Sequence, residues 1–201
     1  MIDLYFAPTG NGQRARIALE EAGLRYRLHK VDFANKGADF LAVNPVGAIP
    51  AIVDDDGPGG QRITLAQSSA ILIYAANKVG KLWPASDAGR LAALQWMMMA
   101  VTDAAPASGV IFLAANALPD KTPANGEFLE NRLLNFFRHF DRRLAGRDYL
   151  ADEFSVADIA LYPVYAARKG IVEKSGGLTN LDRWAASIAA RPAVQRAMKA
   201  D

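Results

Sequence analysis

The chain has 201 residues and contains no cysteine. This absence excludes disulfides, thiolate metal ligands and a thiol nucleophile carried by the protein itself. Histidine is also scarce, because only His29 and His139 occur, and two isolated histidines cannot build a zinc site alone. We therefore predict no resident metal ion and no resident cofactor.

Three further absences narrow the class of protein. The formal net charge is only +2, and no basic run with interleaved aromatic residues predicts a nucleic-acid partner. The N-terminal stretch "MIDLYFAPT" lacks a basic segment followed by an apolar core, so it predicts no secretory signal. No uninterrupted apolar run approaches the roughly 18 residues that span a membrane. We expect a cytoplasmic protein with neither nucleic-acid nor membrane partners.

The first eighty residues mix strand and helix patterns. Residues 2–7 alternate apolar and polar side chains, as in a strand, and then break at a Pro-Thr-Gly-Asn-Gly turn. An amphipathic helix follows, with Gly23 as its expected C-cap, and residues 26–31 form a second strand. This βαβ order predicts two parallel strands joined by a right-handed crossover.

The next segment predicts a hairpin and a closing helix. Two β-rich runs flank Asp-Gly-Pro-Gly-Gly, and a helix is expected at 68–79. A βαβ–ββα order with a proline just before the third strand, here Pro50, is typical of the thioredoxin-like plan. From Ala88 onward the periodicity is helical, and residues 116–126 form a loop between the first two long helices. The expected fold is therefore an α/β thioredoxin-like N-terminal domain, residues 1–82, a linker, 83–88, and an all-α helical domain, 89–201.

Two positions of the first domain suit a peptide ligand. A cis bond before Pro50 would turn the Ile49 backbone groups toward an extended peptide, whereas an ordinary trans proline at a strand start would not. Gln67 and Ser68 begin the helix at 68–79, where unpaired amides favour carboxylates. The alternative for Ser68 is a simple N-cap.

A third position has a structural interpretation. Ser155 and Asp158 have the spacing of a capping box, with Asp158 reaching back to the Ser155 amide. The alternative for Asp158 is a catalytic carboxylate.

Five segments together resemble the cytosolic glutathione transferase superfamily along nearly the whole chain. They are "FAPTGNGQRARIALEE", "NPVGAIPAIVDD", "LAQSSAILIYAANK", "SVADIALYP" and "LDRWAASIAARPAV". The opening turn is most similar to that of the bacterial nu-type (theta-like) group, although Gly10 stands where that group has proline. The resemblance implies glutathione as co-substrate and a two-domain fold.

The resemblance also implies roles for the candidate residues. Ile49, with Pro50 cis, would bind the cysteinyl backbone of glutathione, and Gln67 and Ser68 would hold its γ-glutamyl end. Ala48 replaces a lysine or glutamine that relatives often carry, which predicts a weaker grip on the tripeptide.

Three side chains compete to stabilise the glutathione thiolate. Thr9 lies in the turn, where relatives carry serine or threonine; Asn11 begins the helix; and Tyr5 matches the catalytic tyrosine of other classes. A hydroxyl or amide donor beside a helix N-terminus lowers a thiol pKa from its free value of about 8.5. The order of preference is Thr9, then Asn11 alone or with Thr9, then Tyr5.

Three functions follow from the resemblance. The first is a glutathione transferase that conjugates the thiolate to an apolar electrophile. The second is a glutathione-dependent disulfide reductase or peroxidase that uses two glutathiones. The third is a non-catalytic binding or regulatory protein with the same fold.

The helical domain has two further expected roles. Met97, Met98 and Met99 either line a pocket for the second substrate or belong to the core. By resemblance the protein is a C2 homodimer, with the helix after Ala88 at the interface and Asp103 near the partner's glutathione.

Overall fold

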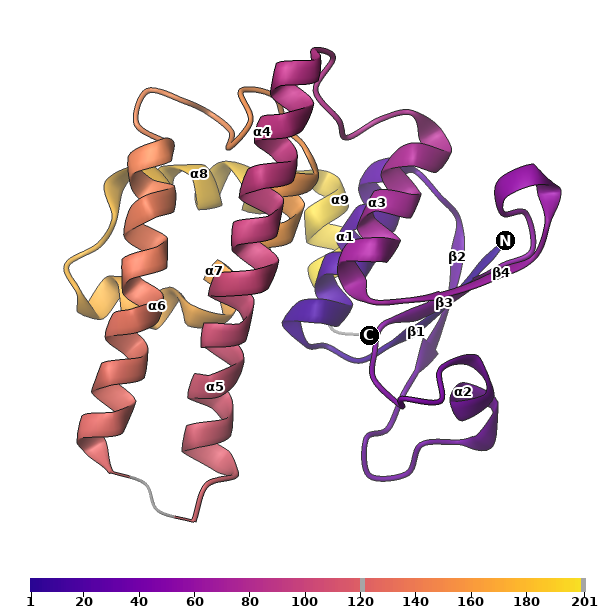
Figure 1. Ribbon diagram of the computed structural model, residues 1–201, viewed down its shortest axis with the longest axis horizontal. Coiled ribbons are helices and arrows are strands. Elements are labelled where there is room, and N and C mark those ends of the chain that lie inside the picture. Colours follow the sequence, from indigo (N-terminus) through magenta and orange to yellow (C-terminus); the bar gives the residue numbers. More distant parts are fainter. Residues whose placement is uncertain (120–121, 200–201) are drawn as a thin grey trace. The chain divides into compact units, whose positions relative to one another are not determined.

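The computed structural model describes residues 1–119 and 122–199 and divides the chain into two compact units (Figure 1). The first unit is Met1–Leu82 together with the segment from Arg191, and the second is Trp83–Ala190. The expected loop at 116–126 includes residues 120 and 121, which lie outside the described residues.

The first unit has the predicted βαβ–ββα order. Its elements are β1 (Ile2–Phe6), α1 (Gly10–Ala22), β2 (Tyr26–Lys30), α2 (Ala38–Val43), β3 (Ala51–Asp54), the 3-10 turn η1 (Pro58–Gly60), β4 (Ile63–Ala66) and α3 (Ser68–Val79). The strand order is β2-β1-β3-β4, with β1 parallel to β2 and antiparallel to β3, and with β3 antiparallel to β4. The thioredoxin-like prediction is confirmed.

Strand alternation assigns the two faces of this sheet. Leu4 and Phe6 are buried on the face where α1 and α3 pack (Figure 1), while Tyr5 points to the other face and packs with Phe40 of α2. The helix α1 ends where predicted, because Gly23 has a φ of 68°, a conformation that favours glycine.

The C-terminal segment differs from the expected domain boundary. The helix α9 (Pro192–Met198) packs on α1 of the first unit, although the prediction grouped it with the helical domain. Two ion pairs join these helices: Arg191 Nε lies 2.6 Å from Glu21 Oε1, and Arg196 Nε lies 2.7 Å from Glu20 Oε2. Helical periodicity predicted α9 itself, but its packing on α1, which buries Ala193, Val194 and Ala197, is a long-range contact that no local pattern predicts.

The second unit is helical, as predicted. Its helices are α4 (Asp87–Met98), α5 (Ala105–Asn116), α6 (Pro123–Arg143), α7 (Val156–Lys174) and α8 (Thr179–Ala189). A π-helical segment, η2 (Met99–Ala104), joins α4 to α5 without a break. Pro106 has no N–H to donate and would clash with the carbonyl four residues earlier, and a locally wider helix accommodates it.

The capping box at the start of α7 is confirmed. The Asp158 carboxylate is fully buried and accepts the N–H groups of Ser155 at 3.0 Å, Leu150 at 3.1 Å and Trp184 Nε1 at 2.8 Å. Burial raises the pKa of Asp158 to about 6, although these hydrogen bonds oppose the rise. Asp158 therefore organises the helical core, which favours the structural interpretation over a catalytic carboxylate.

The continuous helical stretch Asp87–Asn116 is long and apolar, and several of its apolar side chains are exposed. By length and composition alone its 30 residues could cross a membrane, although polar residues interrupt its apolar runs. One such helix is weak evidence, and the prediction of no membrane partner stays a prediction. Met97 is fully buried, so it belongs to the core and not to a pocket, whereas Leu91, Leu94 and Met98 are exposed.

Candidate active site

The opening turn positions two of the predicted residues at the start of α1. Thr9 is the N-cap, and its Oγ1 accepts the Gly12 N–H at 3.2 Å. A hydroxyl that accepts one hydrogen bond can still donate its proton, so Thr9 retains a donor for a ligand. Thr9 and Asn11 are both exposed.

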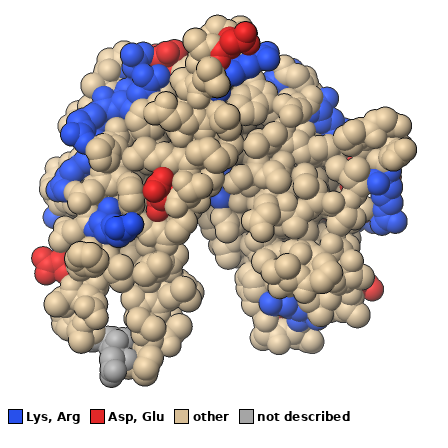
Figure 2. Space-filling view, viewed as in Figure 1, with Lys and Arg blue, Asp and Glu red and all other residues tan. Residues whose placement is uncertain are grey.

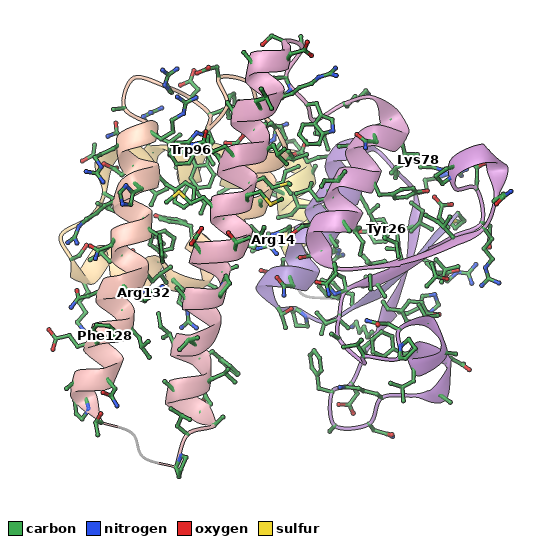
Figure 3. The ribbon with its side chains drawn as sticks, viewed as in Figure 1. Arg14, Tyr26, Lys78, Trp96, Phe128 and Arg132 are labelled. Carbon is green, nitrogen blue, oxygen red and sulfur yellow. The ribbon has the colours of Figure 1, made fainter. Side chains whose placement is uncertain are left out.

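A buried arginine connects the starts of α1 and α3 (Figure 3). Arg14 is only 1% exposed, and its Nη1 donates to Asn11 Oδ1 at 2.7 Å and to Ser68 Oγ at 2.8 Å. Burial lowers the pKa of Arg14 to about 10, so the guanidinium stays charged at neutral pH. The structure therefore brings Asn11 and Ser68 into one polar cluster, although 57 residues separate them.

The bond from Arg14 also determines how the Asn11 amide faces. A guanidinium only donates, so the atom facing it must be Oδ1, and the two N–H bonds of Nδ2 are directed elsewhere. An exposed amide donor at a helix N-terminus is suited to an anionic ligand atom. The sequence prediction missed Arg14, although its position three residues after Asn11, on the same helix face, was a usable signal.

Gln67 adopts a conformation rare for its residue type. Its φ of 73° and ψ of 116° lie in the positive-φ region, and its side chain makes no capping bond at the start of α3. Such backbone strain costs roughly 1–3 kcal/mol and clusters at ligand sites. The uncapped amides of α3 and the buried Ser68 therefore form a second anion-compatible end of the cluster.

The loop before β3 supplies backbone groups. The Ile49–Pro50 bond is cis, as expected, and Asn44 Nδ2 donates to the Ala48 carbonyl at 2.6 Å. Neither the N–H nor the C=O of Ile49 takes part in a loop or turn hydrogen bond among the described residues. Asn44, which was not among the predicted site residues, thus holds this loop while the Ile49 backbone groups stay available.

Tyr5 lies away from this cluster. Its ring stacks on His29, with centroids 4.9 Å apart, and on Phe40, with centroids 5.6 Å apart. His29 Nε2 lies 2.7 Å from Asp3 Oδ1. Tyr5 packs against Phe40 of α2 and does not lie with Thr9 and Asn11 at the start of α1.

Metal binding has no structural support in the described part of the chain. Within residues 1–119 and 122–199, no group of three His, Cys, Asp or Glu side chains could hold a metal ion. The polar cluster instead combines a buried cation, a neutral amide and hydroxyl groups, which suits hydrogen bonding to an anionic organic ligand.

A four-stranded thioredoxin-like unit with a cis-proline loop, followed by an all-helical unit, defines the two-domain glutathione transferase class. The family models for the glutathione S-transferase N-terminal and C-terminal domains match residues 11–78 and 110–201, respectively. The chain belongs to the cytosolic glutathione transferase superfamily.

Similar proteins cover most of the chain. The disulfide-bond oxidoreductase YfcG of Escherichia coli is 39% identical over 81% of this chain and 78% of its own. A Pseudomonas putida glutathione transferase, solved with one glutathione disulfide per subunit, has a TM-score of 0.87 and 36% identity over 98% of this chain and 90% of its own. A Burkholderia graminis glutathione transferase, solved with two glutathiones per subunit, has a TM-score of 0.89 and 34% identity, and the match covers 98% of this chain and 87% of its own.

Proposed function

We propose that the protein binds glutathione in its first unit and uses the glutathione thiolate to reduce a small disulfide. The observation that carries this proposal is the cluster of Asn11, Arg14 and Ser68, which joins an exposed amide donor to an uncapped helix N-terminus. Glutathione presents a thiol and an α-carboxylate at two separate places, and this cluster offers a donor for each.

The residue assignments follow the chemistry of the tripeptide. Asn11 Nδ2, together with the Thr9 hydroxyl, donates to the sulfur, and Ser68 and Gln67 hold the γ-glutamyl end. The Ile49 backbone pairs with the cysteinyl residue as an added strand, next to Pro50. Lowering the thiol pKa by one unit requires about 1.4 kcal/mol, which one hydrogen bond to a charged atom can supply.

The electron balance of the reaction needs no protein thiol. One glutathione thiolate attacks a sulfur of the substrate RSSR, giving GSSR and releasing RS⁻, which takes up a proton. A second glutathione thiolate attacks GSSR, giving GSSG and a second RSH. Two glutathiones are oxidised while one disulfide is reduced, so a chain without cysteine is sufficient. The names and ligands of YfcG and of the two glutathione transferases support this choice.

Conjugation to an apolar electrophile is the second candidate. It needs the same thiolate but one glutathione per turnover, and the matches to the glutathione S-transferase domain models support it. The two reactions differ in product, since conjugation gives a thioether and leaves no GSSG.

A single pair of assays tests both functions. Purified protein is supplied with glutathione and either a small dialkyl disulfide or an activated aryl halide, and GSSG and thioether are quantified. Disulfide reduction that exceeds conjugation supports the proposal, and the reverse supports the second candidate. Absence of glutathione binding at millimolar concentration would exclude both and leave a non-catalytic protein with this fold.

The exposed apolar face supports a homodimer. Leu91, Leu94 and Met98 on α4 are joined by Val110 and Leu113 on α5, all exposed. Figure 2 shows a mostly uncharged surface over α5, which carries no charged residue. A self-complementary patch of this kind fits a C2 interface, and sedimentation analysis of the wild type and of Leu91→Glu tests it. A cytoplasmic location remains part of the same proposal.

A further inference from the structure

Burying the Arg14 guanidinium costs desolvation free energy, which suggests that its hydrogen bonds serve a function. A nearly fully buried guanidinium is expensive to desolvate, and such groups persist where their hydrogen bonds are needed. Among its partners are Asn11 and Ser68, which stand at the two ends of the proposed glutathione site, and both accept from the same atom, Nη1.

We propose that Arg14 is a positioning residue that aligns the thiol-binding and γ-glutamyl-binding ends of the site through Asn11 and Ser68. This inference rests on the proposed function, because it assigns the work that Arg14 does within that site.

Asn11 is the first residue that Arg14 positions. An asparagine amide can face a ligand with either its oxygen or its nitrogen, and the oxygen would repel a thiolate. Because Arg14 can only donate, its 2.7 Å bond selects the orientation in which Nδ2 is the free donor. Removing Arg14 allows the amide to rotate, so the donor is no longer held toward the sulfur.

Ser68 is the second residue that Arg14 positions. Its Oγ accepts from Arg14 at 2.8 Å, and its hydroxyl donates to Asn11 Oδ1 over 3.5 Å, at the limit of a hydrogen bond. A ligand carboxylate within normal hydrogen-bond distance would take the Ser68 proton from this long bond. Since one nitrogen holds both acceptors, a displacement of Arg14 disturbs both ends together.

The chain offers a matched control in Arg16. It lies on the same helix and is 7% exposed, but its Nε donates to the Tyr26 hydroxyl at 3.0 Å and its Nη1 donates to the Lys199 carbonyl at 3.1 Å. Arg16→Met removes a buried arginine from α1 without touching Asn11 or Ser68.

The experiment measures two quantities for each variant. The pKa of the bound glutathione thiol comes from the ultraviolet absorbance of the thiolate as pH is varied, and the glutathione Kd comes from calorimetry. The variants are Arg14→Met, Arg14→Lys, Arg16→Met, Asn11→Ala and the double variant Asn11→Ala/Arg14→Met.

The expected results separate positioning from stability. Arg14→Met raises the bound thiol pKa by about one unit and weakens glutathione binding about tenfold. Asn11→Ala raises the pKa with less change in Kd, and Arg16→Met leaves both quantities near wild type. In the double variant the pKa rises no further than in Asn11→Ala, because Arg14 acts on the sulfur through Asn11.

Two outcomes overturn the inference about Arg14 but leave the proposed function standing. One is an Arg14→Met protein whose pKa and Kd match those of Arg16→Met, and the other is an additive pKa shift in the double variant. If Arg14→Met does not fold, Arg14→Lys retains the charge with a different donor geometry. In Arg14→Lys the pKa of the bound glutathione thiol is expected between the values in wild type and in Asn11→Ala. An Arg14→Lys protein with the wild-type thiol pKa and glutathione Kd would refute the inference. A wild-type protein that binds no glutathione overturns the proposed function as well.

Discussion

Gly12 provides a sharp test of how closely the opening turn is packed. It lies in the first turn of α1, and a Cβ added there would stand 2.1 Å from the Ala7 carbonyl oxygen and 3.1 Å from the Phe6 ring. Real Cβ atoms essentially never approach below 3.0 Å, and the nearest atom belongs to the backbone. Gly12→Ala therefore forces the start of α1 to move.

The size of the effect follows from that movement. Overpacking of this kind costs about 1–3 kcal/mol, and loss of the Thr9 cap adds about 1 kcal/mol. For a chain of this length each kcal/mol lowers Tm by about 2–4 °C. A displacement of about 1 Å at Asn11 also predicts roughly a hundredfold loss of activity in protein that is still folded.

A glycine-to-alanine substitution at Gly109 should have the opposite effect on the free energy of unfolding. Gly109 lies inside α5, is exposed, and has no atom within 4 Å of an added Cβ. Gly109→Ala is expected to stabilise the protein by about 0.5–1 kcal/mol, because alanine favours the helix. Thermal and guanidinium unfolding, followed by tryptophan fluorescence, measure both variants. A Gly12→Ala protein as stable as Gly109→Ala would refute the close-packing argument.

Three more predictions follow from single side chains. Thr9→Val should cost about 1 kcal/mol through the lost cap and raise the bound thiol pKa if the hydroxyl reaches the sulfur; an unchanged pKa in the thiolate titration would leave Asn11 as the donor. The pKa of Asp158 is about 6 in the folded protein, against an ordinary value of 3.8, so the folded state holds this proton more tightly than the unfolded chain does. The stabilisation that this gives is complete below about pH 4 and is lost as the pH rises through about 6. The free energy of unfolding of wild type minus that of Asp158→Asn should thus fall by about 2 kcal/mol from pH 4 to pH 7, and a flat difference in urea titrations would contradict the pKa. Arg191→Met should cost about 1–3 kcal/mol of stability, because it leaves the buried Glu21 carboxylate unpaired. Arg196→Met should cost less than about 1 kcal/mol, because the Arg196 side chain is 55% exposed. Equal denaturation midpoints for the two variants would argue against a stabilising buried pair.

The sequence by itself determined the order of elements and most of the candidate positions. Alternation in residues 2–7, the glycines after α1 and α3, and the capping box at Ser155 are local patterns, and the structure confirms the elements they predict. These features depend on neighbours within a few residues, which is why periodicity and capping rules detect them.

Only the tertiary structure decided which of these residues meet. The contact of Arg14 with Ser68 spans 54 residues, the pairing of Arg191 with Glu21 spans 170, and the placement of Tyr5 depends on which face of the sheet α2 covers. No local pattern encodes these distances, because they arise when the sheet closes and the helices pack against it. Tertiary packing therefore grouped Asn11 with Arg14 and Ser68, and left Tyr5 in a ring stack on the opposite face.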